Sequence, residues 1–101
     1  MNLATVIAKL KNDNHDTFRE LVYTYTPKLM TVARIYTRNA EDAKDVLQDA
    51  FISIYQHIDQ FQGNEERALL AWMKKIVMNA GLAKYKKMSY TKEGYSLDNV
   101  L

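Results

Sequence analysis

The amino-acid sequence predicts an all-α protein, a compact bundle of about four to five helices, and three observations support this class. Apolar residues recur at helical spacing through most of the 101 residues. Only three glycines and one proline are present, so tight turns are too few for a β-sandwich or barrel with many hairpins. Apolar residues make up 48% of the sequence and charged residues 26%, which is typical of one small globular domain.

The first two helices are predicted on either side of a polar cluster at residues 11–14. Leu3, Ile7 and Leu10 lie on one helical face and mark a short helix that ends in this cluster. Asp16 is the predicted N-cap of the next helix.

The single proline interrupts a long apolar stripe. Leu21 and Tyr25 precede Pro27 on one helical face, and Leu29 continues that face beyond it. Proline kinks a helix interior but is tolerated in a first helical turn. Either one kinked helix or two helices meeting at Thr26 and Pro27 therefore fit the pattern.

The clearest helix pattern follows Asn39, which is the predicted N-cap. Glu41 lies in the first turn, where the helix dipole favours acidic side chains. The buried stripe of this helix is predicted to be Ala43, Val46, Leu47, Ala50, Phe51, Ile54, Tyr55 and Ile58. The helix is expected to stop around residues 61–64, where Gly63 can supply a left-handed cap.

The last helix is predicted over residues 65–88, and the sequence from Ser89 onward is predicted to be a tail. Its buried stripe consists of Leu69, Trp72, Met73, Ile76, Val77 and Ala80. Gly81 in the helix interior either weakens the helix locally, at a cost of about 1 kcal/mol against alanine, or lets a partner approach closely.

The net charge of +2 hides two oppositely charged segments. Residues 39–49 carry four acids against one lysine, a net charge of −3. Residues 72–90 carry five lysines and no acid, a net charge of +5, and the remaining residues sum to zero. We expect the acidic helix start and the basic last helix to face different partners.

The basic helix has two interpretations. Lys74, Lys75, Asn79, Tyr85 and Lys86 fall on one exposed side of it. Lysine attracts phosphate, asparagine can pair with a base edge, and tyrosine can stack on an unpaired base, so this side suits nucleic acid. The alternative is a solvated helix face, since basic faces without ligands are common.

The acidic segment also has two interpretations. Acidic residues at a helix start ordinarily compensate the helix dipole. Asp42, Asp45 and Asp49, however, recur at i, i+3 and i+7 beside Gln48, so they form a stripe that continues beyond the first turn. Such a stripe suits a basic partner surface.

Residue patterns for catalysis are lacking. His15 and His57 lie far apart and have no metal-ligand spacing, and no Gly-rich phosphate loop or nucleophile motif occurs. The sequence has no cysteine, which excludes disulfide scaffolds, thiolate zinc sites and cysteine nucleophiles and suits a reducing compartment. No apolar run approaches the ~18 residues of a membrane span. We therefore expect a binding protein, with no cofactor, no metal and no membrane insertion.

The order of these features resembles region 2 of an extracytoplasmic-function (ECF) sigma factor, the promoter-reading subunit of bacterial RNA polymerase. Three stretches carry the resemblance: DTFRELVYTYTPKLMTVARIYT (Asp16–Thr37), AEDAKDVLQDAFISIYQHIDQFQG (Ala40–Gly63) and LLAWMKKIVMNAGLAKYKK (Leu69–Lys87). The second is similar to the family pattern D-A-E-D-x-x-Q-E-x-F, and the third to the family helix with W-L-x-x-I and a following asparagine.

The resemblance implies a role for each segment. It implies that the clamp helices of the largest subunit of core RNA polymerase are bound by Asp42, Asp45, Gln48 and Asp49. The loop of Phe61, Gln62, Gly63 and Asn64 matches the start of one that receives a base flipped out of the non-template strand. The promoter-binding helix contributes Lys74, Lys75, Asn79, Tyr85, Lys86 and Lys87 to the minus-ten element.

The resemblance also predicts the domain organisation. We expect a region 2 domain at 1–90 (short N-terminal helix and loop 1–14, polymerase-binding helices 15–63, promoter-binding helix 64–90), and the start of an interdomain linker at 91–101. A second, helix-turn-helix domain is expected beyond this chain, which we take to be a fragment of a longer cytoplasmic factor. The alternative function is a helical protein-interaction domain whose main ligand is an anti-sigma regulator.

Overall fold

Four α-helices and one 3₁₀ turn make up the part of the chain that the structure describes. The computed structural model describes residues 3–12 and 15–92, and the side chains of residues 4–12 and 15–85. The helices are α1 (Leu3–Lys11), α2 (His15–Ile35), α3 (Ala40–His57) and α4 (Glu66–Lys92), and the turn η1 (Ile58–Gln60) follows α3 directly. The prediction of an all-α bundle is confirmed.

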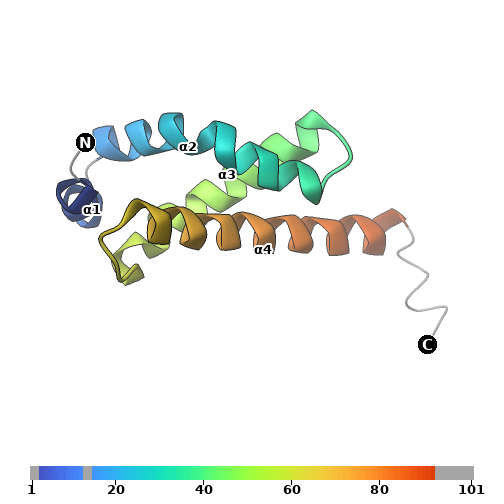
Figure 1. Cartoon of the computed structure of the whole chain (residues 1–101). Helices are drawn as coiled ribbons and strands as arrows, with labels where there is room; N and C mark the ends of the chain where they lie inside the picture. The colour runs from blue at the N-terminus through green and yellow to red at the C-terminus, as the bar shows by residue number, and fades with distance from the viewer. Residues whose placement is uncertain (1–2, 13–14, 93–101) are drawn as a thin grey trace.

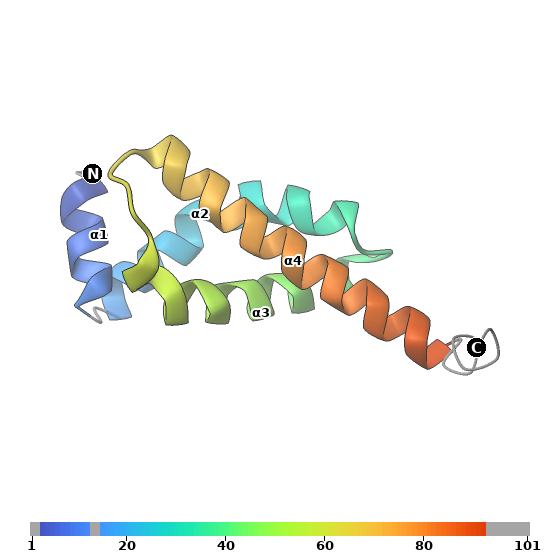
Figure 2. The same ribbon diagram turned by 90° about the horizontal axis from the view of Figure 1, so that it is seen from below.

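Helices α2, α3 and α4 form the body of the bundle. α2 and α4 run in the same direction, while α3 returns antiparallel to them and packs against both (Figure 1). α1 closes one end, where it contacts α2 and η1. The C-terminal part of α4 extends beyond the other helices at the opposite end (Figure 2).

The core lies where these three helices meet. Its largest fully buried side chains are Leu29 from α2, Val46 and Ile54 from α3, and Leu69, Met73 and Val77 from α4. Burial of each contributes about 1.5–3 kcal/mol to the hydrophobic stabilisation of the fold. Trp72, Ile76 and Ala80 are half-buried and pack against this cluster, so the stripe predicted for the last helix does face the core.

α2 passes through Pro27, so the one-helix alternative is confirmed and the two-helix alternative is wrong. Proline lacks the N–H that would donate to the carbonyl of Tyr23. On either side, the hydroxyl groups of Thr26 and Thr31 donate to the carbonyls of Val22 and Pro27, at 2.6 and 3.2 Å. Packing of Leu21 and Leu29 into the core holds the helix on both sides of the proline.

The predicted start of α2 and the predicted end of α4 are wrong. α2 already includes His15, so Asp16 lies in its first turn and is not the N-cap. The acidic side chain still lies near the positive end of the helix dipole. α4 continues to Lys92, although the apolar periodicity ends at Ser89. The helix can continue there because its backbone hydrogen bonds do not require a buried face.

Candidate nucleic-acid and protein interface

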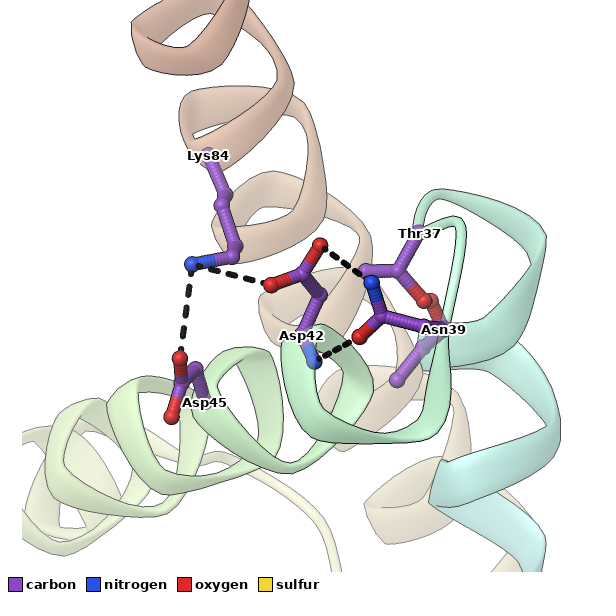
Figure 3. Close-up of polar contacts among 6 residues, drawn as sticks. Thr37, Asn39, Asp42, Asp45 and Lys84 are labelled. Carbon is purple, nitrogen blue, oxygen red and sulfur yellow. Dashed lines mark hydrogen bonds and ion pairs between the residues drawn. The ribbon is translucent and has the colours of Figure 1, made fainter.

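The start of α3 is held by the predicted cap. Asn39 Oδ1 accepts a hydrogen bond from the backbone N–H of Asp42 at 2.8 Å, and Asn39 Nδ2 donates to Asp42 Oδ2 at 3.3 Å (Figure 3). The prediction of Asn39 as N-cap is therefore confirmed. Asp42 thus stabilises the start of the helix through its backbone N–H and one carboxylate oxygen. Its side chain is half-buried.

The predicted docking residues lie on one side of α3, and we call Asp42, Asp45, Gln48 and Asp49 the acidic face. Asp45, Gln48 and Asp49 are exposed to solvent. Lys84 of α4 reaches this face, with its Nζ 3.5 Å from Asp45 Oδ2 and 3.9 Å from Asp42 Oδ1 (Figure 3). Asp49 forms no ion pair with any described residue.

Lys84 joins the two charged segments within the domain. One of the five lysines in the basic segment points to the acidic face, because packing of α4 on α3 brings it beside Asp42 and Asp45. Sequence reasoning missed this contact. Charge alone could not reveal it, since the pairing depends on how the two helices cross.

The loop between η1 and α4 is anchored by Phe61. Its side chain is only 4% exposed, and its ring packs on that of Trp72 with 5.4 Å between centroids. The Phe61 carbonyl accepts a hydrogen bond from Lys11 Nζ at 3.0 Å. In this structure Phe61 therefore supports the loop from inside, and its ring is not on the surface that a base would contact.

Gly63 has a different role from the one predicted. Its backbone does not adopt a left-handed conformation, so the prediction of a left-handed glycine cap is wrong. α3 instead runs directly into η1. A Cβ atom on Gly63 would lie 3.0 Å from Cζ of Phe61, so glycine here permits the close approach of that ring. Gln62, Gly63 and Asn64 are exposed.

The predicted promoter-binding side of α4 is largely open to solvent. Lys74, Lys75, Asn79 and Tyr85 are exposed, and we call these four residues the DNA face. Lys86 and Lys87 belong to α4, but their side chains lie outside the described residues.

Gly81 lets α4 approach Tyr36, the residue that directly follows α2. It is buried, and a Cβ atom added to it would lie 2.7 Å from Cβ of Tyr36. Of the two alternatives raised by the sequence, close approach of a partner is the one that the structure shows, and the partner is Tyr36, the residue directly after α2 in the same chain.

No group of three or more histidine, aspartate or glutamate side chains among the described residues is arranged to hold a metal ion. Within those same residues no helix combines the length and apolarity that crossing a membrane requires.

Comparison with known proteins gives a consistent result. The family model for Sigma-70 region 2 matches residues 21–89. The ECF RNA polymerase sigma factor SigW of Bacillus subtilis is 30% identical over 92 residues, which are 91% of this chain and 46% of that protein. The ECF RNA polymerase sigma factor SigM of Mycobacterium tuberculosis is 30% identical over 86 residues, 85% of this chain and 42% of that protein.

A third relative is also an ECF RNA polymerase sigma factor, from another organism. The ECF RNA polymerase sigma-E factor of Escherichia coli K12 is 28% identical over 74 residues, 73% of this chain and 37% of that protein. The chain spans less than half the length of each of these relatives. It therefore belongs to the Sigma-70 region 2 family, in the form found in ECF RNA polymerase sigma factors.

Proposed function

We propose that this domain acts in transcription initiation by docking on core RNA polymerase and by binding unpaired bases of the minus-ten promoter element. The observation that carries the proposal is the placement of two chemically different exposed surfaces on adjacent helices, the acidic face on α3 and the DNA face on α4. Membership of the Sigma-70 region 2 family supports the pairing of these two roles.

The acidic face suits a basic protein partner. Asp45, Gln48 and Asp49 project from one side of a helix whose other side is held in the core by Val46 and Ile54. A rigid row of carboxylates steers a basic helix toward one orientation and disfavours acidic competitors. We assign to this face the clamp helices of the largest polymerase subunit.

The DNA face suits an unpaired strand. Lys74 and Lys75 supply charge for phosphates, Asn79 supplies a donor and an acceptor for a base edge, and Tyr85 supplies an aromatic ring for stacking. The exposed loop at Gln62, Gly63 and Asn64 lies at the start of the same helix and is the proposed receiver of a flipped base. Trapping flipped bases stabilises the opened promoter without any bond chemistry by this domain.

The DNA assignment is tested by fluorescence anisotropy with a labelled pool of short random single-stranded DNA. Lys75→Glu is expected to weaken binding and Asn79→Ala to reduce sequence preference when selected strands are compared. Lys9→Glu on α1 is the matched control, because Lys9 is also exposed but lies on a different helix. Unchanged affinity in Lys75→Glu together with unchanged sequence preference in Asn79→Ala would refute the DNA assignment.

A helical protein-interaction domain bound by an anti-sigma regulator is the second candidate. Large apolar side chains exposed on α2 favour it, since Tyr23 is 86% and Ile35 is 71% exposed. Core polymerase and labelled single-stranded DNA are titrated separately against the domain. Saturation with either supports the first function, and saturation with neither supports the second.

A further inference from the structure

A basic cleft lies between α2 and the N-terminal half of α4, beside the DNA face, with which it shares Lys74. Its volume is about 490 Å³. The residues that line it are Lys28 from α2 and Glu66, Arg67, Leu70, Ala71 and Lys74 from α4. This volume lies within the roughly 300–1,000 Å³ of typical ligand sites, and it leaves room for a phosphate with its sugar.

The walls of the cleft carry three cations. Lys28, Arg67 and Lys74 are all exposed, and among the described residues none of them forms an ion pair. Their charge is therefore available to an anion. Arginine adds a planar fork of donors that matches the geometry of a phosphate group.

The one carboxylate of the cleft is already engaged. The hydroxyl group of the buried Tyr25 donates a hydrogen bond to Glu66 Oε1 at 3.1 Å. Glu66 is thereby held toward α2, and the cleft keeps an excess of positive charge, with three cations against one anion. Its apolar lining, Leu70 and Ala71, suits the carbon atoms of a deoxyribose.

The cleft is continuous with the DNA face. Lys74 belongs to both, and its chain neighbour Lys75 points about 100° further around α4. A strand contacting Lys75 and Asn79 can therefore continue past Lys74 toward Lys28.

We propose that this cleft binds a backbone phosphodiester of the single strand, with Lys28 and Arg67 as its contacts, so that the DNA path extends from α4 onto α2. The proposal rests on the proposed function of the DNA face. Lys28 is the most specific support for the proposal, because among the described residues that line the cleft it is the one that lies outside α4.

The test is the salt dependence of single-stranded DNA binding by the whole 101-residue chain. Each phosphate contact on a single strand contributes about 0.7 to the slope of log affinity against log salt. Lys28→Gln and Arg67→Gln are each expected to reduce the magnitude of that slope by about 0.7. The affinity of either variant relative to the unmodified domain then changes by about 2.6-fold between 50 and 200 mM salt.

Two controls separate a phosphate contact from a general charge effect. Lys9→Gln on α1 removes the same charge and is expected to leave the slope unchanged, and Lys28→Arg is expected to retain it. A strand with uncharged methylphosphonate linkages should abolish the difference between Lys28→Gln and the unmodified domain. Circular dichroism checks that the variants fold, as expected for exposed residues.

The possible outcomes distinguish the cleft proposal from the proposal that the DNA face binds single-stranded DNA. If the unmodified domain binds DNA but Lys28→Gln and Arg67→Gln keep its full slope, the cleft proposal is refuted and the DNA face stands. If the unmodified domain does not bind single-stranded DNA, both proposals fall together. A loss of slope in Lys28→Gln, with Lys9→Gln unchanged, supports the cleft.

Discussion

Tyr25 places a phenol hydroxyl group in a buried position beside a carboxylate. Burial raises the pKa of Tyr25 above its ordinary value of 10.0, and the hydrogen bond to Glu66 and the negative charge of that residue raise the pKa further. All three causes disfavour the phenolate, so the neutral hydroxyl group that holds Glu66 is stabilised by the folded state.

This pKa shift predicts a loss of stability in alkaline solution. Above pH 10 the unfolded chain releases the Tyr25 proton while the folded domain keeps it, so the free energy of unfolding falls as pH rises. The contribution is complete below pH 10 and is lost as pH rises through the raised pKa of the folded state. Urea unfolding between about pH 9 and about pH 11 measures it.

Tyr25→Phe is expected to make that decline shallower, because the titrating group is gone. Tyr23→Phe is the matched control, since Tyr23 is 86% exposed on the same helix. An equal decline in the unmodified domain and in Tyr25→Phe would show that the buried hydroxyl group does not contribute.

At the scale of elements, the close approach of α4 to the turn after α2 depends on the absence of a side chain at Gly81. Gly81→Ala improves helix propensity by about 1 kcal/mol, but the added Cβ would lie 2.7 Å from Cβ of Tyr36. Overpacking costs about 1–3 kcal/mol. We therefore expect Gly81→Ala to lower the free energy of unfolding in spite of its helix propensity.

A double-mutant cycle isolates that contact. In a Tyr36→Gly background the obstructing atom is absent, so Gly81→Ala should become stabilising by up to about 1 kcal/mol. Urea unfolding of the four proteins gives the coupling free energy. Stabilisation by Gly81→Ala in the unmodified background would contradict the proposed close approach.

The helices themselves could be predicted from the sequence, but their pairing could not. Apolar spacing located the buried stripe of α4, and Asn39 marked the start of α3, because both signals are local. The contacts of Lys84 with Asp45 and of Gly81 with Tyr36 join residues far apart in sequence, and they require the crossing geometry of the helices.

The candidate surfaces could likewise be predicted only in part from the sequence. Exposure of Asp45, Lys75 and Asn79 follows from their opposition to the apolar stripes, and the structure places all three at the surface. Phe61 was predicted at the DNA and is buried, because one aromatic residue in a loop can serve the core as well as a ligand. Lys28 was missed, since only the packing of α2 on α4 brings it to the cleft.

At the scale of the whole molecule, Lys84 links the helix proposed to bind DNA to the face proposed to bind polymerase. Its ion pairs with Asp42 and Asp45 are partly exposed, and such pairs contribute about 0–1 kcal/mol to stability. The larger consequence is for binding, because Lys84 occupies carboxylates that a basic partner would use. A partner helix must compete with this lysine for them.

The affinity of the domain for core RNA polymerase, measured by surface plasmon resonance, tests the central claim most directly. Asp45→Arg is expected to weaken binding at least about tenfold, because it places like charges opposite each other. Lys84→Gln is expected to strengthen binding by about 1.5- to 5-fold by releasing the carboxylates, and Lys84→Arg to leave it unchanged. Full affinity in Asp45→Arg would contradict docking through the acidic face.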